Sequence, residues 1–280
     1  MKKITDKAVK EFGAHLAEEE KSRATFEKYV RDVSAFSRWL GKRELCKAIV
    51  LEYKELLIEK LAPASVNSAL SSLNSFFEYI GEYGLKVKSL KIQKRIFADR
   101  ERELTKAEYN RLLKAARDKG NERLFLLMQT ICASGLRVSE IKFITIEAVK
   151  ARRVEIKCKG KIREAFLPDS LCRGLLKYAK KKGIKGGMIF VTRNGRALDR
   201  TNIWSDMKKL CLIAEVSAKK VFPHNLRHLF ARTFYMIEKD IVHLSDILGH
   251  SSVNTTRIYT METGERHRKQ IQKLGLVMLT

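Results

Sequence analysis

The apolar residues of this chain recur at helical spacing over the first ninety positions, and the pattern then breaks. In the segment 22–40 they fall on one side of a helix that would end at Gly41: Phe26, Tyr29, Val30, Val33, Phe36, Trp39 and Leu40. Three further helices are predicted in the same stretch: 5–18, 44–60 and 63–81, the last of which opens with a proline suited to a first turn. The first ninety residues are therefore expected to fold as a helical domain.

The segment 91–103, K-I-Q-K-R-I-F-A-D-R-E-R-E, is dense in charge and has little apolar periodicity, which is typical of a linker. Order resumes at Thr105, which together with Glu108 has the spacing of a capping box at the start of a helix. The chain is therefore predicted to consist of a domain 1–90, a linker, and a second domain that begins at Leu104.

Residues 153–157 and 163–167 alternate in polarity around Gly160, which predicts a β-hairpin with Lys159 near its tip. Helices are predicted for most of the remaining chain. The fold class is thus expected to be mainly α (α+β), with a helical N-terminal domain and a mostly helical domain 104–280 that holds one small β-sheet.

The chain carries 57 Lys and Arg against 32 Asp and Glu, a formal net charge of +25. Such an excess makes a polyanion such as DNA the first partner to consider, and a membrane surface or simple solubility the alternatives. No apolar run approaches the ~18 residues of a membrane helix, and the first residues lack the apolar core of a signal peptide. The five cysteines are scattered without a C-x-x-C pair, which favours reduced core thiols in a cytoplasmic protein.

Six polar residues together could attack a phosphodiester without a metal: Arg137, Lys159, His224, Arg227, His250 and Tyr259. An arginine fork suits pairs of phosphate oxygens, so two arginines could hold both non-bridging oxygens of one phosphate. A tyrosine becomes a nucleophile when a neighbour such as histidine takes its proton, and a lysine can protonate the departing oxygen. No Asp/Glu cluster for magnesium accompanies them, so neither a metal nor another cofactor is expected.

Each of these residues also has an ordinary structural explanation when it is taken alone. Arg137, at the start of a helix that contains Glu140, could be a surface or ion-paired residue. His250 could cap a helix end, and Tyr259 could be a packed aromatic residue. His224, four residues before another histidine, could belong to a zinc site, although no acidic third ligand lies nearby in the sequence.

The order of the motifs closely resembles the tyrosine recombinase (phage integrase) family: an arginine in A-S-G-L-R, a hairpin lysine, P-H-N-L-R-H, L-G-H-S-S, and a tyrosine nine residues after that histidine. The resemblance covers nearly the whole chain, because S-R-A-T-F-E-K-Y is similar to the core-binding domain of the family and the part from Leu104 onward to its catalytic domain. It implies a Xer-like, two-domain site-specific recombinase. Such an enzyme would cleave and rejoin DNA through a 3′-phosphotyrosyl intermediate and a Holliday junction, without metal or ATP.

The same resemblance implies a role for the basic candidates. Arg137 and Arg227 would clamp the scissile phosphate, and Glu140 would support the first of them. Lys159 would be the general acid of the hairpin. Cys158 departs from the family pattern, because a glycine often precedes this lysine.

The remaining candidates would carry out the proton and strand transfer. His224 would assist proton transfer, His250 would hydrogen-bond the phosphate, and Tyr259 would attack the DNA. Glu238 stands where many relatives have a glycine turn, so a slightly different turn is expected there.

The partner implied is double-stranded DNA with inverted-repeat core sites, bound by a dimer at each site and by a homotetramer on the synapsed pair. Further DNA contacts are expected from six residues: Thr25, Lys28, Arg31, Ser68, Ser71 and Lys161. The C-terminal tail 264–280 mixes basic and apolar residues, and it would dock on a neighbouring protomer or pack on its own domain. Integration and excision, inversion, and resolution all stay open as biological roles, and so does the target sequence.

Three rival functions stay open on the sequence alone. A type IB topoisomerase uses similar chemistry but does not join two sites. A DNA-binding protein without catalysis would carry an inert Tyr259. A zinc hydrolase would bind metal through His224 and His228.

Overall fold

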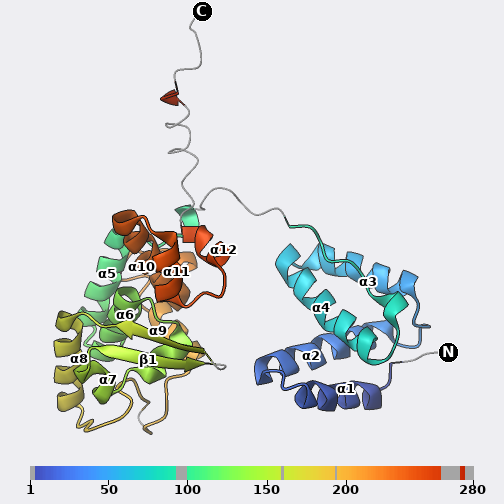
Figure 1. Cartoon of the computed structure of the whole chain (residues 1–280), viewed down its shortest axis with the longest axis horizontal. Helices are drawn as coiled ribbons and strands as arrows, with labels where there is room; N and C mark the ends of the chain where they lie inside the picture. Colours follow the sequence, from blue (N-terminus) through green and yellow to red (C-terminus); the bar gives the residue numbers. More distant parts are fainter. Residues whose placement is uncertain (1–3, 93–99, 159–160, 193, 260–271, 275–280) are drawn as a thin grey trace, which may run out of the picture. The chain divides into compact units, whose positions relative to one another are not determined.

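The computed structural model describes residues 4–92, 100–158, 161–192, 194–259 and 272–274. The chain divides into two compact units, Met1–Lys94 and Arg95–Thr280, and each has a hydrophobic core of its own. Helices make up most of both units (Figure 1), and the strands in the described part of the chain form one two-stranded sheet. The mainly α (α+β) class predicted from the sequence is therefore confirmed.

The first unit contains these helices in its described part: α1 Asp6–Glu18, α2 Arg23–Leu40, α3 Lys47–Lys60, α4 Pro63–Tyr79 and the short 3-10 helix η1 Tyr83–Leu85. Helix α2 packs against both α1 and α4. The rings of Phe12 and Phe76 meet edge to face with centroids 5.3 Å apart, a favoured aromatic geometry, and both are fully buried. The four helices predicted for this stretch are confirmed, with ends that differ by at most three residues.

The second unit has more elements, which follow in chain order: η2 Arg100–Arg102, α5 Lys106–Asp118, α6 Glu122–Ser134, η3 Val138–Phe143, α7 Ile146–Lys150, β1 Arg153–Cys158, β2 Lys161–Phe166, α8 Asp169–Lys181, α9 Arg200–Lys208, η4 Ala218–Lys220, α10 Pro223–Glu238, α11 Ile241–Leu248, α12 Val253–Thr256 and η5 Arg257–Tyr259. Helix α6 packs against α5, α8 and α10, and its residues Leu127, Met128 and Ile131 are almost fully buried. The capping box of Thr105 and Glu108 is confirmed at the start of α5.

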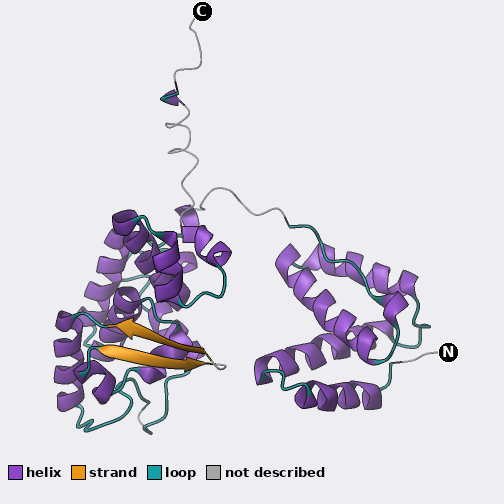
Figure 2. Cartoon of the chain, in the orientation of Figure 1, coloured by secondary structure: helices purple, strands orange, loops and turns teal. Residues whose placement is uncertain are grey.

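Strands β1 and β2 pair antiparallel (Figure 2), and their last pair sets Cys158 opposite Lys161. Lys159 and Gly160 stand between the two strands in the sequence, so the hairpin prediction is confirmed. Both of these residues lie outside the described part of the chain. The inner face of the sheet packs on the core of the unit, where Ile156 is 1% exposed.

One expectation about the cysteines was wrong. Cys46 is exposed at the N-cap position of α3 and does not lie in the core. Cys172 and Cys211 are buried as predicted, and Cys132 is half-buried. Cys46 precedes the first turn of its helix, where the apolar stripe has not yet begun. The prediction of a core position was based only on its being a cysteine, and it was wrong for that reason.

The end of the segment predicted as a linker is bound to the second unit. Asn225 donates a hydrogen bond of 2.7 Å to the carbonyl oxygen of Arg102, and Arg232 pairs with Glu103. Residues 93–99 lie outside the described part of the chain. At the other end of α10, Lys239 adopts the left-handed conformation (φ 55°) that ends the helix just after Glu238, and the difference from the turn of relatives stays a prediction. None of the helices described is long and apolar enough to cross a membrane.

Candidate active site

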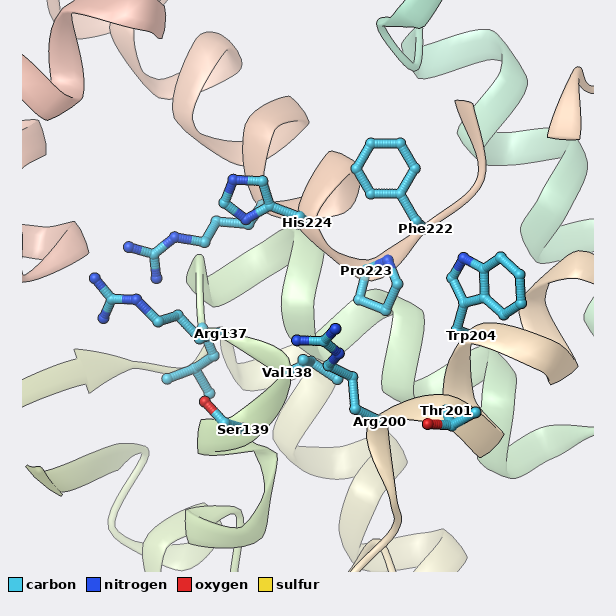
Figure 3. A pocket seen from close by; sticks show the side chains of 11 residues that line it. Arg137, Val138, Ser139, Arg200, Thr201, Trp204, Phe222, Pro223 and His224 are labelled. Atoms are coloured by element: carbon cyan, nitrogen blue, oxygen red, sulfur yellow. The ribbon is translucent and has the colours of Figure 1, made fainter. Parts of the chain in front are cut away.

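Five of the six candidate residues converge in the second unit from separate elements: Arg137 at the N-cap of η3, His224 and Arg227 in the first turns of α10, His250 just after α11, and Tyr259 in η5. A cavity of about 650 Å³ opens beside Arg137, His224 and Arg227 (Figure 3). The sixth candidate, Lys159, lies outside the described residues.

Arg137 is held by a carboxylate on its own short helix. Its backbone N–H donates to Oε2 of Glu140 at 2.8 Å, and its Nη1 donates to Oε1 of the same residue at 2.9 Å. Its Nη2 donates to the carbonyl oxygen of Gly249 at 3.3 Å. Because Glu140 is buried and Arg137 is partly exposed, the ion pair orients the arginine while leaving part of its fork toward the cavity.

Arg227 is the most deeply buried charge in the described part of the chain, with 1% of its surface exposed. Its guanidinium donates to the carbonyl oxygen of Gly135 and, at 2.7 Å, to that of Leu248. Burial and the nearby charge of Arg137 lower the pKa of Arg227 to about 10, so it stays protonated at neutral pH. The backbone carbonyl oxygens of Gly135 and Leu248 therefore fix the Arg227 guanidinium at the edge of the cavity.

His250 connects Arg227 to helix α12. Its Nε2 lies 3.1 Å from Nη2 of Arg227, and its Nδ1 lies 2.9 Å from Oγ1 of Thr256. Burial, followed by the charges of Arg227 and Arg137, lowers the pKa of His250 to about 4. The imidazole is therefore neutral at pH 7.

Tyr259 lies among aromatic rings and is 4% exposed. The ring of His228 meets it edge to face with centroids 4.8 Å apart, and the ring of His250 stacks at 6.2 Å. Burial raises the pKa of the Tyr259 hydroxyl, whereas the charge and hydrogen bond of Arg227 oppose that shift. The arrangement sets the tyrosine beside a cation that stabilises its ionised form.

The two histidines of P-H-N-L-R-H differ in their surroundings. His224 lines the cavity, and burial, Arg227 and Arg137 lower its pKa. The ring of His228 lies 4.5 Å from that of His224, and its Nε2 is buried without a hydrogen-bond partner. Burial, followed by the charge of His224, lowers the pKa of His228 to about 3. Among the residues that the structure describes, no group of three His, Cys, Asp or Glu is placed to hold a metal ion.

The wall of the cavity opposite the candidate residues comes from α9 and from Phe222, which immediately precedes α10. Figure 3 shows Arg137 and His224 on one side, Trp204 and Phe222 on the other, and Arg200 between them. Trp204 is 47% exposed. A cationic wall that faces an aromatic wall suits a nucleotide, because phosphate and base make those two kinds of contact.

The candidate DNA contacts of the first unit lie on α2 and α4. The Nζ of Lys28 is bonded to Asp32, to the Ser68 carbonyl oxygen at 3.0 Å and to the Ser72 hydroxyl at 3.2 Å. These bonds engage the amine within the unit, so Lys28 is less available to a phosphate than its sequence position indicates.

Of the other candidates on these helices, Arg31 and Ser71 are accessible, whereas Thr25 and Ser68 are half-buried. The side chain of Arg31 is 70% exposed, and Ser71 is exposed with its hydroxyl donating to Asn67. The hydroxyl of Thr25 lies 2.8 Å from that of Ser22, within the cap of α2. The side chain of Lys161 is outside the described part of the chain.

Three residues near the site were missed by the sequence analysis. Thr256 holds His250, and Arg163 on β2 reaches both Glu140 and the end of α11. Trp204 lines the cavity. Only Trp204 left a signal, as an aromatic four residues after an arginine on a helix. The contacts of Arg163 join segments far apart in the sequence, and Thr256, six residues after His250, belongs to no recognised motif.

Comparisons with known proteins identify the family of both units. The sequence profile described as "Phage integrase family" matches residues 102–266, and that described as "Phage integrase, N-terminal SAM-like domain" matches residues 9–82. Tyrosine recombinase XerA of Pyrococcus furiosus is 26% identical over 288 residues, which span 99% of this chain and 96% of that protein.

Solved structures share the fold. A lambda integrase(75–356) dimer bound to a COC′ core site superposes with a TM-score of 0.73 at 18% identity, covering 93% of this chain and 96% of that one. A lambda integrase tetramer bound to a Holliday junction gives 0.72 at 19% identity, covering 90% and 76%. Since the first profile matches more than half of the sequence, the chain belongs to the phage integrase family, the tyrosine recombinases.

Proposed function

We propose that this protein breaks and rejoins duplex DNA with the Tyr259 hydroxyl as nucleophile, forming a 3′-phosphotyrosyl link and releasing a 5′-hydroxyl. Membership of the family makes site-specific DNA recombination its activity. The observation that supports the chemistry best is the grouping of Tyr259 and His250 around Arg227, which lines the same cavity as Arg137 and His224.

The two arginines would bind the scissile phosphate. Arg137 and Arg227 line the same cavity and are anchored from behind by Glu140 and by backbone carbonyl oxygens. Donors fixed before the reaction stabilise charge that develops on phosphate oxygens without having to reorganise. The same cations favour the ionised form of Tyr259, as the direction of their effect on its pKa indicates.

The histidines would divide two tasks. His224 is neutral at pH 7, because its pKa is lowered from 6.5, so it can accept the proton that leaves Tyr259. His250 accepts a hydrogen bond from Arg227 through Nε2, and it thereby orients the arginine. A hydrogen bond from His250 to the phosphate would require the tautomer with its proton on Nε2. Lys159, which stands between the two strands in the sequence, would protonate the 5′-oxygen that departs.

The link to tyrosine conserves the energy of the phosphodiester, so we propose that neither ATP nor a metal ion takes part. The attack makes one P–O bond and breaks another, and the reverse step, with a 5′-hydroxyl as nucleophile, restores DNA and tyrosine. Apart from the DNA, every group required for this exchange is an amino-acid side chain of this protein.

The DNA would carry inverted-repeat core sites, each bound by a dimer, with four protomers on the synapsed pair. The net charge of +25 and the exposed Arg31 and Ser71 of the first unit support binding along a duplex. The relatives seen as a dimer on a core site and as a tetramer on a Holliday junction support the assembly. The tail 264–280, of which only residues 272–274 are described, would dock on a neighbouring protomer.

Covalent trapping tests the proposal. Purified protein and the variant Tyr259→Phe are each incubated, in the presence of EDTA, with nicked duplexes from DNA that flanks the native gene, and denaturing gels and peptide mass mapping follow. The nick lets a short fragment leave, so that the covalent intermediate accumulates. We expect a DNA adduct on Tyr259 and none in the variant, which should bind the same duplex equally well.

Two results would contradict the proposal. One is tight binding to a defined site on a duplex without formation of any covalent adduct. That result would favour DNA binding without catalysis. The other is an adduct that forms only when a divalent metal is supplied.

A further inference from the structure

Arg163 is a largely covered arginine on β2 that has no part in the reaction as proposed so far. Its side chain is 13% exposed and faces the same side of the hairpin as its cross-strand neighbour Ile156. Its Nη1 donates to the carbonyl oxygen of Ile247 at 2.8 Å, and its Nη2 pairs with Oε2 of Glu140. The two arms of one guanidinium thus join the hairpin to two separate segments of the site.

The first of these segments holds Arg137. Glu140, whose side chain is 7% exposed, gives one carboxylate oxygen to the guanidinium of Arg137 and the other to both the Arg137 backbone N–H and Arg163. A carboxylate shared in this way has little freedom to rotate. Arg163 therefore fixes the orientation of Glu140, and Glu140 fixes that of Arg137.

The second segment carries His250. The stem of Arg163 lies so close to Gly249 that a Cβ atom there would collide with its Cδ atom. Gly249 has a φ of +60° and its carbonyl oxygen accepts a hydrogen bond from Arg137. The donated bond to Ile247 meets the C-terminal end of α11, where a positive charge is favourable. Arg163 thus supports the turn from which His250 reaches Arg227.

We propose that Arg163 is a positioning residue of the phosphate clamp: it locks Glu140 and the 247–249 turn to the hairpin, so that Arg137, and Arg227 through His250, meet on one phosphate. The inference rests on the proposed function, since it assigns a role within that strand-transfer site. Arg163 itself would touch neither the DNA nor Tyr259.

Two variants and one control test the proposal. Arg163→Met retains much of the stem without its charge, and Arg163→Lys retains the charge without the fork that serves two acceptors. Arg153→Met is the matched control on the same hairpin, where the side chain is 61% exposed and pairs with Glu164. The readouts are urea unfolding, affinity for a core-site duplex, and the single-turnover rate of covalent adduct formation.

We expect Arg163→Met to form the adduct about 10²-fold more slowly, because small displacements of reacting groups have effects of this size. DNA affinity should stay within about twofold, and Arg163→Lys should fall between the variant and the wild type. Combining Arg163→Met with Glu140→Gln should slow the reaction far less than the product of the two single effects, since both act through one carboxylate. The control should react at the wild-type rate.

A substrate with sulfur in place of the 5′-bridging oxygen separates the clamp from the hairpin lysine. A thiolate leaves without being protonated, so this substrate should restore Lys159→Ala but not Arg163→Met. Restoration of Arg163→Met would overturn the proposal, because the arginine would then act through Lys159. A normal rate for Arg163→Met and Arg163→Lys, or a loss that only follows unfolding, would also overturn it. Failure of the wild-type protein to form an adduct would instead refute the proposed function.

Discussion

The Nη2 atom of Arg227 lies 3.1 Å from Nε2 of His250, and this contact determines how the histidine can be protonated. An arginine only donates hydrogen bonds, so Nε2 must accept. The histidine is neutral at pH 7, because its pKa is lowered to about 4, and its one ring proton therefore lies on Nδ1. That proton points to the hydroxyl of Thr256, 2.9 Å away. A buried threonine thus sets the tautomer that orients the arginine fork.

This relationship predicts the effect of Thr256→Val. Valine has nearly the same shape but cannot accept the Nδ1 proton of His250, and an unsatisfied buried donor costs roughly 1–3 kcal/mol. We expect adduct formation to slow about tenfold, since 1.4 kcal/mol corresponds to a factor of ten. Thr255→Val, at the exposed neighbouring position, is the control. Equal rates for the two variants in single-turnover trapping would show that the threonine does not orient the histidine.

The half-buried histidines predict how stability depends on pH. Burial lowers the pKa of His228 to about 3 and that of His250 to about 4, from an ordinary 6.5. Below pH 6.5 the unfolded chain takes up protons that the folded chain does not. The contribution of these histidines to the free energy of unfolding should therefore be fully present above pH 6.5. It should fall as the pH drops, by up to about 1.4 kcal/mol per pH unit for each histidine.

Urea unfolding between pH 7.5 and 5, above the range in which most carboxylates titrate, measures this slope. His228→Leu removes the titration with the most strongly lowered pKa and should make the slope shallower, while His224 and His250, whose pKa values are also lowered, keep part of it. An unchanged slope in the variant would mean that the buried ring of His228 is not the source of the pH dependence.

Much of the fold could be predicted because its signals are local. The stripe from Phe26 to Leu40 and the capping box at Thr105 depend only on residues within a few turns, and both have the predicted structure. The hairpin was predictable for the same reason, because its strands alternate on either side of a glycine. Apolar periodicity and helix-capping residues, however, predict where helices and strands lie in the sequence and do not predict how they pack together.

The support of the site could not be predicted, because its contacts either cross long sequence separations, as those of Arg163 do, or follow no recognised motif, as the six-residue step from His250 to Thr256 does. Arg163 meets Glu140 and Ile247, and Thr256 meets His250, without any motif that marks them. Lys28 is a case in which the sequence predicted a contact that the fold makes less available. Its position favoured a DNA contact, but Asp32 and the backbone of α4 bind its amine.

Gly135 gives a prediction about stability. It ends α6 in the left-handed conformation at φ +65°, and a Cβ atom there would lie 2.5 Å from the ring of Phe230. Gly135→Ala should therefore destabilise the protein by about 2–4 kcal/mol, from backbone strain together with overpacking. Gly120→Ala is the control, since that glycine also has a positive φ but open space around it. Urea unfolding of both variants isolates the collision, and equal losses would rule it out.

Lys239 gives the opposite case. It is an exposed residue held at φ 55° at the end of α10, a conformation that glycine adopts without strain. Lys239→Gly should stabilise the protein by about 0.5–1 kcal/mol, because the relief of strain exceeds the added entropy of the unfolded chain. Lys239→Ala, which retains the strain, should give no such gain. A rise in thermal midpoint for alanine equal to that for glycine would point to the loss of charge as the cause.

Arg137→Lys tests whether the shape of the clamp matters beyond its charge. The guanidinium of Arg137 donates to Glu140 and to Gly249 from different nitrogens, and this leaves the fork aimed along the cavity. An ammonium group can pair with Glu140 but cannot also reproduce the planar set of donors for two phosphate oxygens. We expect the single-turnover rate to fall by at least about 10²-fold, with DNA affinity within about twofold, because the lost interaction forms chiefly in the transition state. Arg153→Lys, on the exposed edge of the hairpin, should leave both quantities unchanged. A near-normal rate for Arg137→Lys would mean that charge alone suffices at this position, and the bidentate clamp would have to be abandoned.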